Sequence, residues 1–95
     1  METLVVHCKK HEFDIYIGRP GPWGNPFREG VDGSRRQVIE QFRIWFLTSQ
    51  DEKAIWMRNN VRNLAGKRLG CWCSPKPCHG TVLAFYSTYD KNLFF

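Results

Sequence analysis

A chain of 95 residues is long enough for one folded domain and too short for a second hydrophobic core. Fourteen basic residues against nine acidic ones give a net charge of +5. This charge suits an anionic partner, either a nucleotide or a nucleic acid, although the basic residues form no block typical of a nucleic-acid-binding tail.

The sequence shows neither a signal peptide after Met1-Glu2 nor a run of the roughly 20 apolar residues that a membrane span needs. We therefore expect a cytoplasmic protein with no membrane partner. In a reducing compartment, its four cysteines are expected to be free or metal-bound rather than paired in disulfides.

Two short segments near the N-terminus have the residue patterns of β-strands. Residues 3–8 (TLVVHC) form an apolar run typical of a buried strand. Residues 13–17 alternate between apolar and more polar side chains, as in a half-buried strand. The polar residues 9–12 fit a turn, so the pattern is compatible with a hairpin and equally with one long bent strand.

A loop rich in glycine and proline follows. The segment IGRPGPWGNPFREGVDGS (17–34) contains five glycines and three prolines, which exclude a helix or a central strand. A flexible linker has no reason to carry Arg19, Trp23 and Phe27. We therefore predict an ordered loop that holds these side chains for ligand binding.

Two helices are expected next. Ser34 and Gln37 form a capping-box pattern, which predicts a helix that begins at Ser34. Its apolar residues follow helical spacing and form a broad buried face: Val38, Ile39, Phe42, Trp45 and Phe46. A second helix is predicted from about Asp51 to Ala65, and Gly66 is suited to end it.

The last third of the chain is predicted to contain one strand and one helix. Residues 67–73 read as a strand with Leu69, Cys71 and Cys73 on one face, and the prolines at 75 and 77 prevent its continuation. Cys78-His79-Gly80 then leads into a helix. The aromatic C-terminus (93–95, LFF) is interpreted as an exposed patch or a contact through which the chain forms a homo-oligomer.

These elements predict a single α/β domain over residues 1–95, with a short, mostly parallel sheet and three helices. Ligands of such sheets bind beyond the carboxyl ends of the strands, where loops lead into helices. The 17–34 loop and the 74–80 loop both follow predicted strands. If these strands are parallel neighbours, Arg19 and the Cys78-His79-Gly80 segment share one pocket rim.

Three cysteines and a histidine lie within LGCWCSPKPCHG (69–80), and three interpretations are compatible with them. A thiol at a helix start has its pKa lowered by backbone N–H groups, and histidine carries protons near neutral pH, so Cys78 and His79 are candidate catalytic residues. Cys71 and Cys73 fit small buried hydrophobic residues. The third interpretation is a metal site.

The spacing argues against the metal site, and none is assigned, although His7, Cys8 and His11 could complete such a site if the first strand lies beside the third. Zinc takes about four N or S ligands at tetrahedral corners. Residues two apart on a strand lie about 6.5–7 Å from each other, and no CxxC pair is present. The adjacent side chains of Cys78 and His79 are expected to diverge. We expect both residues to line the ligand site without supporting the core.

Two motifs together resemble a small uncharacterised family found in bacteriophages and bacteria. They are YIGRPGPWGNPF (16–27) and GKRLGCWCSPKPCHG (66–80), which match an early GRP…GNPF loop and a late CWC-x-P-x-x-CHG segment. The resemblance covers nearly the whole chain and implies a compact α/β fold. Cys8 lies outside the pattern. The matching positions are Gly18, Arg19, Gly24, Asn25, Pro26, Cys71, Cys73, Pro75, Cys78, His79 and Gly80.

The sequence as a whole predicts a nucleotide- or nucleoside-binding domain that binds or cleaves a phosphorylated nucleotide. Arg19 would contact phosphate, the amides of 78–80 would bind an anion, and Trp23 or Phe27 would stack on a base. The other ligand-binding candidates are Gly18, Gly24, Asn25 and Gly80. The resemblance implies a phage-encoded protein that acts in the host cytoplasm.

Two alternatives belong to other functional classes. The first is a Cys/His module, stabilised by a metal, that docks a protein or nucleic acid. The second is a thiol protein that responds to oxidants. The sequence decides neither between binding and catalysis nor for any cofactor.

Overall fold

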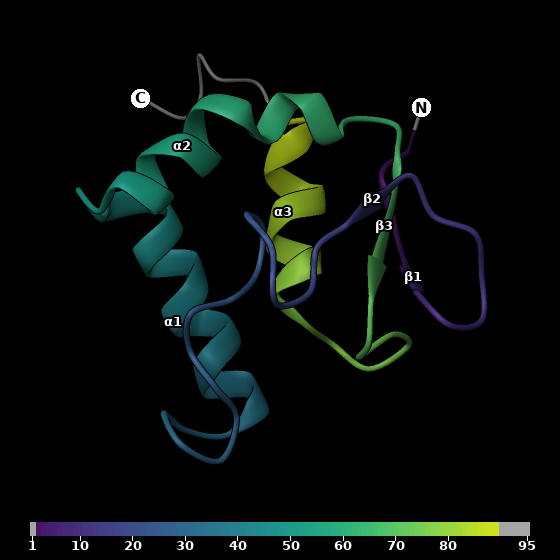
Figure 1. Cartoon of the computed structure of the whole chain (residues 1–95). Coiled ribbons are helices and arrows are strands. Elements are labelled where there is room, and N and C mark those ends of the chain that lie inside the picture. The colour runs from purple at the N-terminus through teal and green to yellow at the C-terminus, as the bar shows by residue number, and fades with distance from the viewer. Residues whose placement is uncertain (1, 90–95) are drawn as a thin grey trace.

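Three helices pack on one side of a three-stranded parallel sheet in the computed structural model, which describes residues 2–89 (Figure 1). The strands are β1 (Leu4–His7), β2 (Ile15–Tyr16) and β3 (Arg68–Cys71). The helices are α1 (Arg35–Thr48), α2 (Glu52–Asn60) and α3 (His79–Ser87), and a 3-10 turn η1 (Val61–Leu64) follows α2. The predicted α/β class with a parallel sheet and three helices is confirmed.

The strand order is β1-β3-β2, with both outer strands parallel to β3. Val5 of β1 and Ile15 of β2 both align with Leu69, so residues 8–14 carry the chain back along the sheet between the two strands. The predictions of a hairpin or of one long bent strand are wrong. The two N-terminal strands do not pair with each other because β3 lies between them.

The returning segment covers part of the second face of the sheet. Leu69 and Cys71 are buried, and side chains alternate along a strand, so Gly70 faces the other way. A Cβ atom on Gly70 would lie 2.6 Å from Cγ of Phe13. Glycine at this position therefore allows the ring of Phe13 to lie directly against the central strand.

The helices and strands lie where they are predicted, and their boundaries differ mainly at the end of α2 and at the end of β3. Ser34 and Gln37 form the complete capping box before α1. The helix predicted from Asp51 to Ala65 ends at Asn60 and continues as the 3-10 turn, and Gly66 then adopts φ +74°. The third strand ends at Cys71 rather than 73, because β1 pairs no further than His7 with Cys71.

The core lies between the sheet and the helices, with α3 between the sheet and the α1–α2 pair (Figure 1). Ile17 and Leu69 contribute from the sheet side, Phe42 and Phe46 from α1, and Leu83 from α3, and all five are fully buried. Each fully buried side chain of this kind stabilises the fold by about 1.5–3 kcal/mol relative to an exposed position.

Two further sequence predictions concern a membrane span and the C-terminal subunit contact. No helix within residues 2–89 has the length and apolar character that crossing a membrane requires. The predicted subunit contact at 93–95 lies outside the described residues.

Candidate functional site

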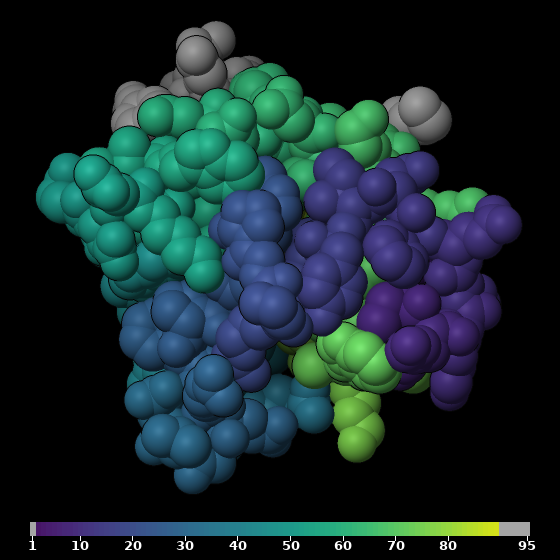
Figure 2. All heavy atoms as spheres, viewed as in Figure 1, coloured from purple at the N-terminus to yellow at the C-terminus, as the bar shows by residue number. Residues whose placement is uncertain are grey.

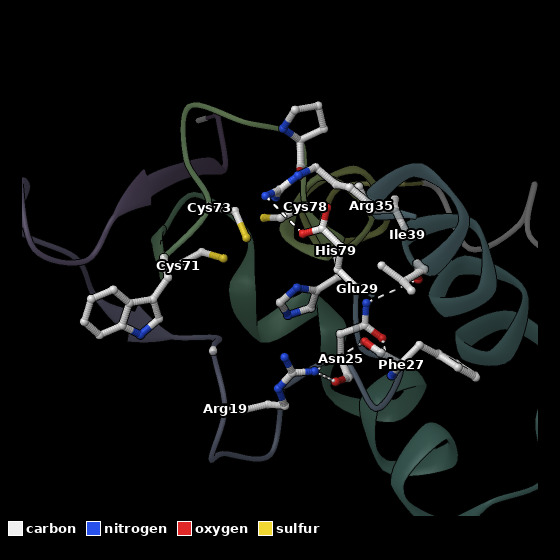
Figure 3. A pocket seen from close by; sticks show the side chains of 14 residues that line it. Arg19, Asn25, Phe27, Glu29, Arg35, Ile39, Cys71, Cys73, Cys78 and His79 are labelled. Carbon is white, nitrogen blue, oxygen red and sulfur yellow. Dashed lines mark hydrogen bonds and ion pairs between the residues drawn. The ribbon is translucent and has the colours of Figure 1, made fainter. Parts of the chain in front are cut away.

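A cavity of about 160 Å³ lies at the carboxyl edge of the sheet, where the two predicted loops meet (Figure 3). Its walls come from the 18–29 segment, the first turns of α1, the segment after β3 and the start of α3. Arg19, Cys78 and His79 all line it, as the argument from the parallel sheet predicts. On the surface, the segments near residues 20–30 (blue) and 72–78 (green) lie next to each other (Figure 2).

Arg19 holds the loop in shape. Its Nη1 donates hydrogen bonds to the carbonyl oxygens of Asn25 at 2.7 Å and Phe27 at 3.3 Å. Within residues 2–89, no hydrogen bond engages its Nε or Nη2. Arg19 therefore shapes the loop through one nitrogen, and the N–H groups of Nε and Nη2 have no hydrogen-bond partner among the described residues.

Asn25 fastens the same loop to α1. Its Nδ2 donates to the carbonyl of Val38 at 3.2 Å, and its Oδ1 accepts from the amide of Phe27 at 2.9 Å. The side chain is buried, and both of its polar atoms are engaged within the protein. Asn25 lines the cavity as predicted, but its side chain supports the loop. Phe27 lines the cavity half-buried, with its ring edge-on to Trp45.

Arg35 is a cavity residue that the sequence analysis missed. It is the first residue of α1, and its guanidinium donates to the carbonyl of Pro77 at 3.2 Å and pairs with Glu29 at 3.3 Å. The pKa of Arg35 is raised, mainly because its guanidinium interacts with the neighbouring Cys73 side chain through a hydrogen bond. The N-cap pattern at Ser34 is the sequence signal that points to Arg35. This cap places Arg35 in the first turn of α1, beside the 17–34 and 74–80 loops.

Cys71, Cys78 and His79 form a buried cluster. One ligand atom of each residue lies within 4.8 Å of the other two. Cys71 ends β3, and Cys78 is the N-cap of α3 with extended backbone, φ −152° and ψ 177°. His79 is the first helical residue, so the chain turns between Cys78 and His79 and their side chains converge. The expectation that these adjacent side chains diverge is wrong.

The two thiols of the cluster share a hydrogen bond that moves their pKa values in opposite directions. The Cys71 thiol donates to Cys78, which raises the pKa of Cys71 far above its usual value, and burial adds to this effect. The same bond lowers the pKa of Cys78, and the amide of Gly80, 3.3 Å from Cys78 Sγ, helps to lower it, although burial opposes both. Cys78 is thus the group that carries the more stable thiolate.

His79 is neutral and fixed in one tautomer. Burial lowers its pKa, so the imidazole is uncharged at neutral pH. Its Nε2 lies 2.8 Å from the carbonyl oxygen of Ile17 and 3.0 Å from that of Trp23. Two acceptors require the proton on Nε2, so Nδ1 carries the available lone pair. The ring lies between the cysteine sulfurs and the loop with Arg19 and Asn25 (Figure 3).

Cys78 and His79 support the core as well as lining the cavity, which corrects the expectation that they only line a site. Cys78 is 4% exposed and His79 is 7% exposed. The ring of His79 stands edge-on to Phe42 with centroids 5.1 Å apart. Cys71 is buried as predicted, whereas Cys73 lies past the strand and is only partly buried.

Three predicted ligand-binding residues are not among the residues that line the cavity. Trp23 is buried against Trp56, with centroids 4.9 Å apart, so its ring is not accessible to a base. A Cβ at Gly24 would lie 2.7 Å from the Arg19 side chain. A Cβ at Gly80 would lie 2.7 Å from Ile17, so this glycine permits close packing of α3 rather than approach of a ligand. Gly18 does line the cavity.

Comparison with known proteins relates nearly the whole described sequence to a family. The model of the family described as "Domain of unknown function (DUF4326)" matches residues 6–88. A protein of Enterobacteria phage T4, described as an uncharacterized 12.4 kDa protein in the nrdA-td intergenic region, is 40% identical over 80 residues. The matched part covers 84% of this chain and 72% of the phage protein. No solved structure matches. The resemblance to a family with a phage member is confirmed.

Proposed function

We propose that this chain, which belongs to the family described as a domain of unknown function (DUF4326), binds a small phosphorylated nucleotide in the cavity. The observation that carries the proposal is that two guanidinium groups, of Arg19 and Arg35, line one cavity together with aromatic side chains. Arginine forks match the geometry of phosphate oxygens, and aromatic faces accept any nucleobase.

The phosphate is assigned to the two arginines rather than to the helix start. The amide of Gly80 donates to Cys78 Sγ and the amide of Thr81 donates to the carbonyl of Cys78, so these N–H groups are engaged within the protein. Arg19 retains Nε and Nη2, whereas Glu29 balances part of the charge of Arg35. Arg19 is therefore the main phosphate contact in this proposal.

The base is assigned to the rim of the cavity. Trp72 lines the cavity and is 53% exposed, and its Nε1 donates to Tyr16 Oη at 2.8 Å. This bond orients an accessible indole, which Trp23 does not offer. Phe27 provides a second, half-buried ring.

The volume of the cavity and the carboxylate that lines it bear on which part of the nucleotide binds inside it and on whether the nucleotide is cleaved. A cavity of about 160 Å³ has room for a phosphate group, since about 10–15 Å³ of probe-occupied volume is enough to hold one water molecule. The sugar and base would extend over the rim. Among the described residues, Glu29 is the one carboxylate that lines the cavity, and it is paired with Arg35. This supports binding rather than hydrolysis by paired carboxylates. The similarity to a phage protein supports the proposal that binding takes place in the cytoplasm of a host cell.

Calorimetric titration with nucleoside monophosphates and the matching unphosphorylated nucleosides tests the proposal. A hydrogen bond to a charged group contributes about 1.5–3 kcal/mol, so the nucleosides should bind about 10- to 100-fold more weakly. Arg35→Gln should weaken monophosphate binding. Arg36→Gln is the matched control, because Arg36 is exposed and does not line the cavity. Equal affinities for nucleoside and monophosphate, or equal losses in the two variants, would refute the proposal.

A further inference from the structure

The ligand atoms of Cys71, Cys78 and His79 come close to the spacing of a metal site. Bond lengths of about 2.3 Å to sulfur and 2.0 Å to nitrogen at tetrahedral angles place neighbouring ligand atoms about 3.5–3.8 Å apart. The three atoms already lie within 4.8 Å of one another, and all three residues are buried. Small side-chain movements would therefore bring them onto one ion.

The hydrogen bonds around His79 are those of a metal ligand. A histidine that binds a metal through one ring nitrogen usually donates the other N–H to a carbonyl or carboxylate, which fixes the ring. His79 donates its Nε2–H to the carbonyls of Ile17 and Trp23. Its Nδ1 lone pair is left for the ion.

We propose that Cys71, Cys78 and His79 bind one divalent metal ion of the zinc class, with the fourth coordination position facing the cavity. Two thiolates and an imidazole select zinc over magnesium or calcium, which require oxygen ligands. The inference goes beyond nucleotide binding and does not rest on it.

The fourth position is open in this proposal because the cluster within residues 2–89 contains three ligands and all three line the cavity. Structural zinc sites take four protein ligands, whereas sites with three leave a position for water or substrate. Cys73 lines the same cavity, beside Arg35 and near Cys78, but it is not a member of the cluster whose ligand atoms lie within 4.8 Å of one another. A water molecule or an oxygen of a bound anion would complete the coordination.

Cobalt titration of the reduced, chelator-treated chain tests the site. Co²⁺ substitutes for zinc, and we expect one ion per chain, the strong visible bands of tetrahedral cobalt, and displacement by zinc. The thiolate-to-cobalt charge-transfer band should have the intensity of two thiolates. This readout needs no nucleotide, so it fails or succeeds independently of the proposed function. Absence of the bands, or an intensity that corresponds to three or four thiolates, would overturn the proposal.

Serine variants identify the ligands. Loss of a hydrogen-bond partner of a ligand typically lowers metal affinity about 10- to 100-fold, so Cys71→Ser and Cys78→Ser should each lower it by more than this. Cys8→Ser is the matched control, because Cys8 is a free, partly buried cysteine outside the cluster. Cys73→Ser should also retain the metal. Equal loss of affinity in Cys73→Ser would overturn the open position. If a cluster variant fails to fold, the cobalt spectrum of the unaltered chain still decides.

Discussion

Arg19 shapes the loop through Nη1 and also lines the cavity, so in the proposed function one side chain serves both the loop and the phosphate. Lysine could replace the bonds to the carbonyls of Asn25 and Phe27, but its single ammonium group would then have no fork left for phosphate. We expect Arg19→Lys to weaken monophosphate binding about 10- to 100-fold, nearly as much as Arg19→Ala.

Calorimetry with the same monophosphate measures the affinity in both Arg19 variants, and the thermal midpoint reports the loop. Arg19→Lys should keep a midpoint closer to that of the unaltered chain than Arg19→Ala does. Unchanged affinity in the lysine variant would show that Arg19 serves the loop alone.

At the residue scale, the sequence indicates which loops meet and some, but not all, of the side chains that line the cavity. Arg19 and Phe27 line it as predicted, because the loop leaves the carboxyl end of β2. Trp23 lies in the same loop and turns inward onto Trp56 of α2. No local pattern carries that contact, since it depends on how α2 packs against the loop.

At the element scale, the cap of α1 supports the helix that carries Arg35. Ser34 Oγ accepts from the Gln37 amide at 3.2 Å, and Gln37 Oε1 accepts from the Ser34 amide at 2.8 Å. Ser34→Ala should lower the free energy of unfolding by about 1 kcal/mol, as loss of an N-cap typically does. Urea denaturation measures the change. Ser34→Asp is the control that keeps the cap, and an equal loss in both variants would show that capping is not the cause.

The contact between Gly70 and Phe13 tests how closely the returning segment covers β3. Gly70→Ala should cost about 1–3 kcal/mol of unfolding free energy, because the new methyl group meets the ring of Phe13. The cost should shrink when Phe13 is also alanine. A double-mutant cycle by urea denaturation gives the coupling energy. Coupling near zero would mean that the ring moves aside freely.

The ends of β3 and α3 explain why the sequence does not predict the Cys71, Cys78 and His79 cluster as a metal site. The sequence pattern predicts that Cys71 and Cys73 lie on one strand and that the side chains of Cys78 and His79 diverge. The strand ends at Cys71, and the chain changes from extended to helical backbone between Cys78 and His79. Sequence periodicity describes the interior of an element. The cluster forms at element ends, where no period applies.

At the scale of the whole molecule, His79 links the parts that surround the cavity. It begins α3, holds the carbonyls of Ile17 and Trp23 after β2, and packs its ring against Phe42 of α1. Removing the ring would leave two buried carbonyls without a partner and a void beside Phe42. The sequence suggested a residue of the site alone, whereas the structure makes it part of the core.

His79→Ala should therefore lower the free energy of unfolding by about 2–4 kcal/mol, from the lost hydrogen bonds and the void together. Urea denaturation with a chelator present measures this effect apart from any bound metal. His11→Ala is the matched control, because His11 is exposed and should change stability by less than about 0.5 kcal/mol. If the two histidine variants were equally stable, His79 would not hold the loop and helices together, and the cavity would owe its shape to the remaining contacts of Asn25 and Arg19.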